Sequence, residues 1–272
     1  MNRFFAFGCS FTKSNRDSTW ADILGAQFDY YENWGQPGAG NSFIFYSLIE
    51  CCKRNKINKD DTVAIMWTSI GREDRFIQGK GWITPGSIYN QNVYPIDFVK
   101  QFADPTGYLL RDLVHLSAAR KILQEIGCKY YFFSVVPLKI FDDNTHNYFD
   151  IETSIIELYK DDLFEVKPSV YEVVFNNNWY SRPGKVDIDL VKNEYINLRG
   201  NEWPSWEKFV LREFDGVSKT ILKEIDEKYN LSNKLLIRSD THPTANESHE
   251  YLLKVYGKLE KKFSKSREVI RF

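Results

Sequence analysis

The sequence predicts an α/β fold in which about five parallel strands form a sheet with helices on both faces, a three-layer α/β/α sandwich. Short apolar runs recur along the chain, and most are continuous rather than alternating, as in strands that are covered on both faces. Helical segments lie between the runs, and such alternation builds parallel sheets with right-handed crossovers. The predicted strands are residues 4–7, 30–34, 62–67, 129–136 and 235–238.

Cap residues mark three of the helices. Asp104 followed by Pro105 is a typical helix start, with the carboxylate at the cap and proline in the first turn. Thr244 and Glu247 have the spacing of a capping box. The predicted helices are residues 41–54, with a cap on Asn41 or Ser42, residues 104–127, and the last helix, through about Phe263.

We expect residues 1–272 to form a single domain with two insertions. Residues 70–103 combine glycine, proline, asparagine and aromatic residues without clear periodicity. Residues 138–215 are longer and hold three tryptophans among many polar residues. We expect both insertions, partly helical, at the carboxyl edge of the sheet.

Composition limits the classes of partner. Hydrophobic residues make up 43% of the chain and aromatic residues 16%, which is ample for a core. The formal net charge is −1, from 36 basic and 37 acidic residues, and this balance argues against general binding to nucleic acid or anionic membranes. No apolar stretch approaches the ~20 residues of a membrane span. No signal peptide is visible, so we expect a cytoplasmic protein.

The four cysteines predict neither a metal site nor a disulfide framework. Cys9, Cys51, Cys52 and Cys128 lack the spacing of either. Cys51 and Cys52 are neighbours on a predicted helix and project in different directions. We therefore expect reduced cysteines in a cytosolic protein.

A hydroxyl nucleophile is predicted at the end of the first strand. Gly8, Cys9 and Ser10 follow the apolar run directly, and open α/β folds build their sites at this carboxyl edge. Gly8 permits a tight exit from the strand, and the N–H of Ser10 can point into the same cleft as its side chain. Ser10 could instead cap the next helix. Cys9 is the rival nucleophile, but alternation along the strand end points it away from Ser10.

A glycine-rich loop follows the second strand. Gly35, Gly38 and Gly40 allow the backbone to approach a ligand closely and to aim N–H groups at it. In an acyl-transfer enzyme such a loop supplies an oxyanion-hole donor. The loop could instead cradle a phosphate, although it lacks the Lys-Ser/Thr ending of a P-loop, or form an ordinary strand-to-helix turn.

His242 is the candidate base. It lies between a strand end and a helix start, and Asp240 stands two residues before it. A serine hydroxyl is a poor nucleophile until a base takes its proton, so Ser10, His242 and Asp240 carry the groups that a serine hydrolase needs. The other histidines have simpler explanations, mid-helix, in a polar insertion and on the last helix: His115, His146 and His249.

Together these pieces resemble the SGNH/GDSL hydrolase family. Residues 8–12 resemble its first block, in which the serine of a Gly-Asp-Ser-like motif is the nucleophile. Residues 33–41 resemble its second block, whose glycine, here Gly38, gives a backbone N–H to the oxyanion hole. Residues 240–243 resemble its last block, with the catalytic aspartate and histidine just before a proline. The resemblance spans the chain in the right order, and it implies the family's flavodoxin-like sandwich.

Two departures from the family pattern bear on the site. The family has its aspartate three residues before the histidine, where this chain has Ser239. Either Asp240 orients the imidazole, or a backbone carbonyl holds His242 in a Ser-His dyad. The family's third block also gives an asparagine side chain to the oxyanion, and residues 66–72 contain none. The candidate replacements are Asn41, which we prefer, Thr68, Ser69 and Arg72.

The resemblance implies a serine esterase that acts through an acyl-enzyme on Ser10, without a metal or an organic cofactor. Its catalytic residues would be Ser10, His242 and Asp240, and its oxyanion donors Ser10, Gly38 and Asn41. The expected substrate is a small-molecule or glycan ester, for example an O-acetyl group. Aromatic residues of the insertions could stack on sugar rings or pack as a lid. The alternatives are an O-acyltransferase that uses the same site and a non-catalytic relative that binds a glycan or a protein.

Overall fold

The computed structural model describes part of the chain, and all of that part belongs to one compact unit. The described residues are 1–14, 18–90, 93–138, 149–176 and 242–259. The predicted strand at residues 235–238 and the candidate residue Asp240 lie outside them. The prediction of one domain over the whole chain stays a prediction.

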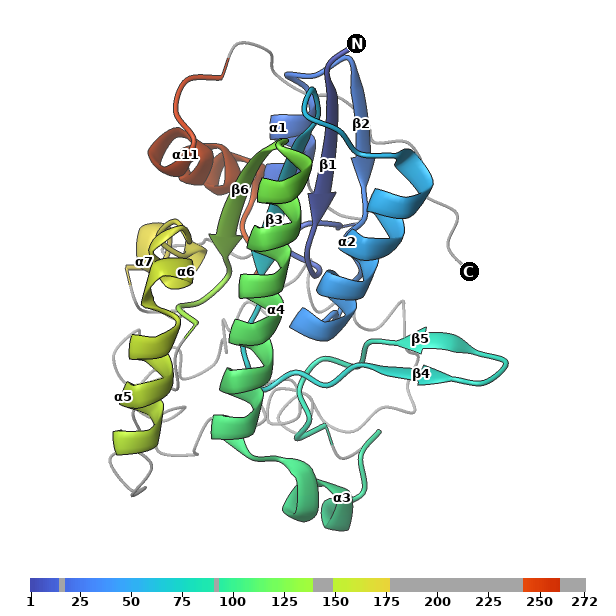
Figure 1. Cartoon of the computed structure of the whole chain (residues 1–272), viewed down its shortest axis with the longest axis vertical. Coiled ribbons are helices and arrows are strands. Elements are labelled where there is room, and N and C mark those ends of the chain that lie inside the picture. The colour runs from blue at the N-terminus through green and yellow to red at the C-terminus, as the bar shows by residue number, and fades with distance from the viewer. Residues whose placement is uncertain (15–17, 91–92, 139–148, 177–241, 260–272) are drawn as a thin grey trace, which may run out of the picture. The chain divides into compact units, whose positions relative to one another are not determined.

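Four parallel strands form the central sheet in the order β2-β1-β3-β6 (Figure 1). They are β1 (Arg3–Phe7), β2 (Tyr30–Asn33), β3 (Thr62–Trp67) and β6 (Lys129–Ser134). All six residues of β3 are buried, as expected for a continuous apolar run. The parallel sheet confirms the predicted fold class, and the order begins as in flavodoxin-like sheets, with β1 and β3 adjacent where the strand order reverses.

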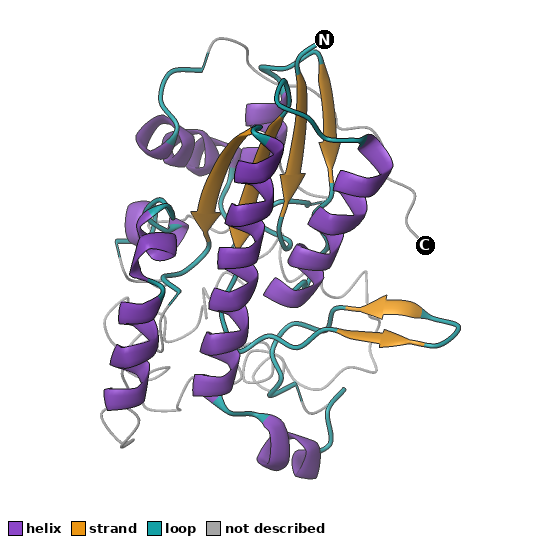
Figure 2. Cartoon of the chain, viewed as in Figure 1, coloured by secondary structure: helices purple, strands orange, loops and turns teal. Residues whose placement is uncertain are grey.

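Helices cover both faces of the sheet (Figures 1 and 2). One face carries α2 (Asn41–Asn55) and α4 (Pro105–Ile126), and the other carries α1 (Trp20–Gly25) and α11 (Ala245–Val255). On this second face, Phe133 of β6 meets two rings edge-on. Its centroid lies 5.1 Å from the Trp20 ring and 5.9 Å from the Tyr251 ring. Segments from both ends of the sequence therefore share one layer of the core.

The two strongest cap signals predict their helices correctly. The Asp104 side chain accepts a hydrogen bond from the Gly107 N–H at 2.7 Å and begins α4. Thr244 and Glu247 form the predicted capping box, with the Thr244 N–H donating to the Glu247 carboxylate at 2.7 Å.

The predicted end of the last helix, at about Phe263, is wrong. The helix α11 ends at Val255, because Gly257 follows with φ +112° and turns the backbone out of the helix.

Both predicted insertions hold regular structure. The first contains an antiparallel hairpin, β4 (Arg75–Ile77) with β5 (Gly81–Ile83), and then α3 (Ile96–Phe102). The described part of the second contains α5 (Phe149–Leu158), α6 (Lys160–Phe164) and α7 (Val170–Val173). Figure 1 shows the hairpin beyond the carboxyl ends of the strands, where the first insertion was expected.

The cysteines are free thiols, and three of them are buried: Cys9, Cys51 and Cys128. Burial raises the pKa of Cys52 and Cys128 to about 11, which leaves these thiols protonated near neutral pH. Among the described helices, none is both long enough and apolar enough to cross a membrane.

Candidate active site

The chain passes from β1 into the Ser10 turn through Gly8, and a larger residue at this position would have to push its neighbours aside. Gly8 has φ +157°, and a Cβ there would lie 2.0 Å from the Thr12 hydroxyl oxygen. The N–H groups of Thr12 and Lys13 both donate to the Cys9 carbonyl, at 2.9 and 3.1 Å, and close the turn around Ser10. Ser10 is half-buried, whereas Cys9 is fully buried. The turn therefore presents the hydroxyl and encloses the thiol.

Thr12 anchors this turn to its neighbours. Its carbonyl accepts hydrogen bonds from the Thr19 hydroxyl at 2.7 Å and from the Asn33 amide at 2.8 Å. Its hydroxyl accepts a hydrogen bond from the Trp20 indole at 3.2 Å. Thr12 is fully buried, so these bonds are shielded from water. They hold the turn between α1 and β2.

His242 lies against the Ser10 turn. Its ring packs on the ring of Phe11, the residue after Ser10, with the centroids 4.7 Å apart and the planes at 40°. His242 is half-buried, and the capping box of α11 begins two residues later. The fold thus brings the predicted base to the predicted nucleophile's turn, while Asp240 lies outside the described residues. Of the other histidines, His115 stacks on Phe45 in the α2–α4 layer, His249 is exposed on α11, and His146 lies outside the described residues.

The glycine-rich loop runs beside the same turn. The Gln36 N–H donates to the Gly8 carbonyl at 3.0 Å. Gly38 has φ +74°, and a Cβ there would lie 2.0 Å from the Thr84 carbonyl oxygen, so only glycine fits. Within the described part of the chain, the N–H groups of Gly38 and Ser10 have no hydrogen-bond acceptor.

The start of α2 differs from the prediction. Gly40 is the N-cap, and Asn41 is the first helical residue rather than the cap. The Asp74 carboxylate accepts hydrogen bonds from the Gly40 N–H at 2.8 Å and the Phe43 N–H at 2.9 Å, and so closes the helix end. Burial raises the pKa of Asp74 above its ordinary value. A cap on Asn41 or Ser42 is therefore wrong, because a carboxylate from the first insertion satisfies these donors.

Asn41 joins the start of α2 to the residue that follows β3 and to the middle of α4. Its side-chain oxygen accepts a hydrogen bond from the Thr68 N–H at 2.8 Å. Its amide nitrogen donates to the Thr68 carbonyl at 3.0 Å and to the Asp112 carboxylate at 2.7 Å. Both amide hydrogens are therefore used. Burial raises the pKa of Asp112 to about 6, and Arg111 donates to the same carboxylate at 2.7 Å.

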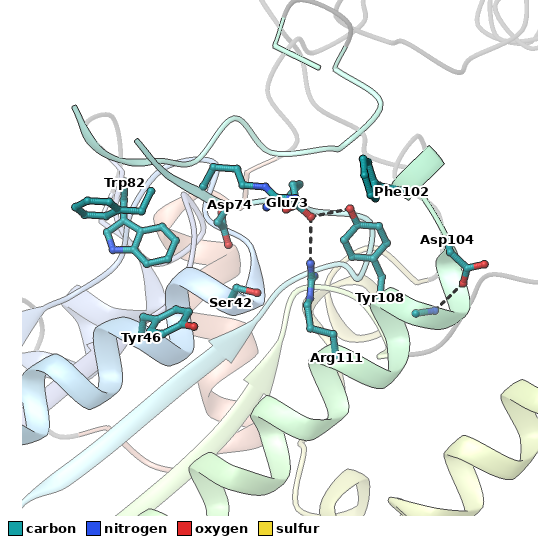
Figure 3. A pocket seen from close by; sticks show the side chains of 12 residues that line it. Ser42, Tyr46, Glu73, Asp74, Trp82, Phe102, Asp104, Tyr108 and Arg111 are labelled. Carbon is teal, nitrogen blue, oxygen red and sulfur yellow. Dashed lines mark hydrogen bonds and ion pairs between the residues drawn. The ribbon is translucent and has the colours of Figure 1, made fainter. Parts of the chain in front are cut away.

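A cavity of about 550 Å³ lies beside the start of α2 (Figure 3). One wall is aromatic, with the Trp82 ring 5.2 Å from the Tyr46 ring and 5.8 Å from the Phe76 ring. The opposite wall holds Glu73, which accepts a hydrogen bond from the Tyr108 hydroxyl at 2.6 Å. The cavity is lined by Ser42, Tyr46, Glu73, Asp74, Arg75, Phe76, Trp82, Phe102, Asp104, Gly107, Tyr108 and Arg111.

Sequence reasoning missed the charged wall of this cavity. Glu73 pairs with Arg75 at 2.7 Å and with Arg111 at 3.4 Å. These residues come from the first insertion and from α4, and no local spacing relates them. The aromatic content of residues 70–103 was the one available signal. Among the described residues, no group of three or more His, Cys, Asp or Glu side chains is placed to hold a metal.

Comparisons with known proteins find likeness only at the level of structure. No protein-family description and no curated protein sequence matches the chain. A lipolytic protein of the G-D-S-L family from Veillonella parvula DSM 2008 is 15% identical, over 68% of this chain and 88% of that chain, with a TM-score of 0.37. The psychrotrophic esterase EstA from a Pseudoalteromonas species is 12% identical, over 77% of this chain and 99% of that chain, also with a TM-score of 0.37. Likeness at this level does not carry a functional assignment.

Proposed function

We propose that this protein is a serine esterase that hydrolyses a carboxylic ester through an acyl-enzyme on Ser10. One observation carries the proposal: the ring of His242 packs on Phe11, in the turn that presents Ser10. A base from the far end of the sequence thereby reaches the turn of a half-buried serine at the carboxyl edge of a parallel sheet. Open α/β folds place their sites at this edge, and a serine needs such a base to act as a nucleophile.

The proposed reaction is an acyl transfer to water in two steps. His242 takes the proton of the Ser10 hydroxyl while its oxygen attacks the ester carbonyl carbon. The tetrahedral intermediate expels the alcohol, which leaves with the proton from His242. Water then loses a proton to His242 and attacks the acyl-enzyme, and the acid departs as the proton returns to Ser10. Asp240 would stabilise the imidazolium in both steps.

Two backbone donors support an oxyanion hole. The N–H groups of Ser10 and Gly38 have no acceptor among the described residues, and both belong to loops linked by the bond from Gln36 to Gly8. Such donors stabilise the negative charge that develops on the carbonyl oxygen. Asn41, the third donor that the sequence predicts, uses both amide hydrogens on Thr68 and Asp112. It serves an oxyanion only if one of these bonds opens.

Ser10, Gly38 and His242 do not line the cavity beside α2. We propose that this cavity binds the alcohol part of the ester, and its aromatic wall favours an alcohol that carries a ring. Tyr46 and Phe76 are more than half exposed, and with Trp82 they offer ring faces for stacking. Sugar rings stack on such faces, so an O-acetylated glycan is the substrate we propose, with small aryl esters as surrogates. Transfer of the acyl group to a sugar hydroxyl instead of water is the second candidate, since the same cavity would hold the acceptor.

The test combines turnover with active-site labelling. Wild-type protein should hydrolyse 4-nitrophenyl acetate and react with a fluorophosphonate probe. Ser10→Ala should abolish labelling and lower turnover by at least about 10³-fold, because removal of a catalytic serine leaves only residual rate enhancement. The matched control is Cys9→Ala, which removes the neighbouring thiol and should keep both signals.

Three results would contradict or redirect this proposal. Labelling that survives in Ser10→Ala excludes Ser10 as the nucleophile. A folded wild-type protein that neither labels nor turns over any ester favours the binding alternative. Acylated sugar formed in the presence of an added sugar acceptor identifies the transferase.

A further inference from the structure

We propose that a groove between the C-terminal ends of α2 and α4 binds a fatty-acid carboxylate, with the alkyl chain in the groove and the carboxylate on Lys53 and Lys56. The groove has a volume of about 600 Å³. Small-molecule sites have volumes of about 300–1,000 Å³. The α2–α4 groove is lined by Ile49, Cys52, Lys53, Lys56, Ile57, Ile122 and Ile126. This proposal does not depend on the proposed esterase function.

The α2–α4 groove lies far from the Ser10 turn. Both helices lie on the same face of the sheet (Figure 1). The helix α2 begins at Asn41, which bonds to Thr68 after the end of β3, and it ends at Asn55, before β3 begins at Thr62. With a rise of about 1.5 Å per residue, its 15 residues place these two ends about 22 Å apart. The groove is therefore at the amino edge of the sheet, whereas the Ser10 turn is at the carboxyl edge.

The walls of the α2–α4 groove are apolar and open to solvent. Ile49 and Cys52 are three residues apart on α2, and Ile122 and Ile126 are four residues apart on α4, so each pair shares one face of its helix. These four side chains are half-buried, while Ile57 is buried. An alkyl chain in this groove would remove the exposed parts of these side chains from water, which is favourable.

Two lysines supply the charge of the α2–α4 groove. Lys53 and Lys56 each follow another lining residue of α2 by four positions, so they extend the same face of the helix. Both are exposed, and neither amine forms an ion pair with any residue that the structure describes. None of the described residues that line the groove is acidic. A carboxylate is the complement of this pair of ammonium groups.

The residues around the α2–α4 groove leave its charge positive. Glu50, the one acidic residue of α2, forms an ion pair with Arg54 at 2.7 Å. Lys59 lies against the end of α4, since a Cβ on Gly127 would be 3.9 Å from the Lys59 Cβ. The last carbonyls of each helix carry a partial negative charge of about half an elementary charge. The full charges of the lysines exceed it.

The lining also restricts the kind of ligand. Its only polar side-chain groups are the two lysine amines and the Cys52 thiol. The hydroxyls of a sugar or the amides of a peptide would lose water along the apolar walls without gaining a partner, which is unfavourable. A ligand that fits must therefore gather its polar atoms at one end and make them anionic. A fatty acid has this form.

The first experiment measures binding by displacement of a fluorescent fatty acid, dansylundecanoic acid. Dodecanoate should displace it, and decanoate should bind about 10- to 20-fold more weakly, because each methylene removed from apolar surroundings changes the affinity about four-fold. Dodecanol, which has the same chain without the charge, should bind about 5-fold more weakly than dodecanoate, as expected for ion pairs at an exposed site.

Variants assign the carboxylate to the two lysines. The double variant K53Q/K56Q should bind dodecanoate no better than dodecanol, and its affinity for dodecanol should equal that of the wild type. The matched control is Lys121→Gln, which removes an exposed lysine of α4 that does not line the groove and should keep the wild-type preference. Ser10→Ala should bind dodecanoate with wild-type affinity.

Alkylation of Cys52 locates the bound chain. Cys52 is half-buried in the groove, whereas the other three cysteines are buried. Saturating dodecanoate should slow the reaction of Cys52 with iodoacetamide at pH ~9 by at least about 5-fold, measured by mass spectrometry of the Cys52 peptide, because a ligand in the groove covers the thiol.

Four results would overturn the inference. Absence of dodecanoate binding excludes the site. Equal affinities for dodecanoate and dodecanol in the wild type exclude a role for the lysines, as does an unchanged preference in K53Q/K56Q. Binding without protection of Cys52 places the fatty acid elsewhere, and loss of binding in Ser10→Ala would place it at the proposed active site.

Discussion

At the scale of single residues, Gly38 sets the path of the loop beside the Ser10 turn. We expect Gly38→Ala to lower the free energy of unfolding by about 2–4 kcal/mol, because an L-residue is strained at positive φ and its Cβ would meet a backbone carbonyl. At Gly38 φ is +74° and that carbonyl, of Thr84, would lie 2.0 Å from the Cβ. Urea denaturation measures the change, and turnover should fall with it.

Gly79 provides the matched control. It also has positive φ, +77°, but a Cβ there would meet nothing within 4 Å. Gly79→Ala should therefore lower the free energy of unfolding by about 1 kcal/mol, from the backbone alone. Equal losses in the two variants would show that the contact with Thr84 contributes nothing.

His115 gives the stability a pH dependence. Burial, helped by the charge of Arg111, lowers its pKa from 6.5 to about 4. His115 therefore takes up a proton near pH 6.5 in the unfolded chain but only near pH 4 in the folded chain. Because the unfolded chain binds more protons between these values, the free energy of unfolding falls as the pH falls through this range. His115→Gln removes this contribution. We expect the wild type to lose stability relative to this variant between pH 7.5 and 4.5 in urea titrations.

The difference in the free energy of unfolding between the wild type and His115→Gln reports the contribution of His115 alone. Asp112, whose pKa burial raises to about 6, contributes the opposite trend over part of the same range. It is present in both proteins, so its contribution cancels in the difference. A difference that stays constant with pH would contradict the lowered pKa of His115.

At the scale of elements, α2 depends on a carboxylate from outside its own sequence. Asp74 accepts from two N–H groups of the helix start, at 2.8 and 2.9 Å. We expect Asp74→Ala to lower the free energy of unfolding by about 2 kcal/mol, because two buried donors lose their acceptor. Urea denaturation measures it.

Asp104→Ala is the control variant with which the loss of stability in Asp74→Ala is compared. Asp104 caps α4 locally and accepts one bond, from an exposed position, at 2.7 Å. Its loss should cost about 1 kcal/mol or less. An Asp74→Ala variant that is no less stable than Asp104→Ala would show that the distant carboxylate adds nothing beyond an ordinary cap.

The caps of α2, α4 and α11 show which helix starts the sequence can predict. Asp104 and the Thr244 capping box act within three or four residues, so their spacing predicts the start of a helix. The bond from Asp74 to Gly40 spans 34 residues, and only tertiary structure relates the two. The end of α11 was missed for a different reason, since Gly257 had to be weighed against a helical pattern that continues past it.

The same distinction applies to the candidate site. The position of Ser10 follows from the apolar run that stops at Gly8, and that of His242 before a helix follows from the capping box that begins at Thr244. The strand predicted before His242 lies outside the described residues. The link from Asn41 to Asp112 spans 71 residues and joins α2 to α4, so no motif contains it. The preference for Asn41 as a donor came from its residue type alone, whereas the bonds of its amide depend on its neighbours in the fold.

At the scale of the whole molecule, α11 ties the C-terminal part of the described chain to the central sheet. Tyr251 is 1% exposed, packs on Phe133, and donates from its hydroxyl to the Pro168 carbonyl at 3.0 Å. We expect Tyr251→Ala to lower the free energy of unfolding by about 3–5 kcal/mol, as for other large buried rings. Fluorophosphonate labelling should fall as well, because His242 precedes this helix.

Tyr251→Phe separates packing from the hydrogen bond. It keeps the ring and loses only the hydroxyl, so the free energy of unfolding should fall by about 1 kcal/mol and labelling should persist. Thermal or urea unfolding followed in parallel with labelling checks both variants. Full labelling in folded Tyr251→Ala would contradict the dependence of the His242 position on α11.

The contact between Phe11 and His242 has a consequence for biosynthesis. Ribosomes add about 5–20 residues per second, so the imidazole is made roughly 10 to 50 s after the ring it will cover. During that interval the nascent chain can pair β1 with β2 and then with β3, but the Ser10 turn has no His242 beside it. A ribosome-bound chain stalled before residue 242 should therefore carry an unreactive serine, and reactivity should appear only after His242 and α11 have been made.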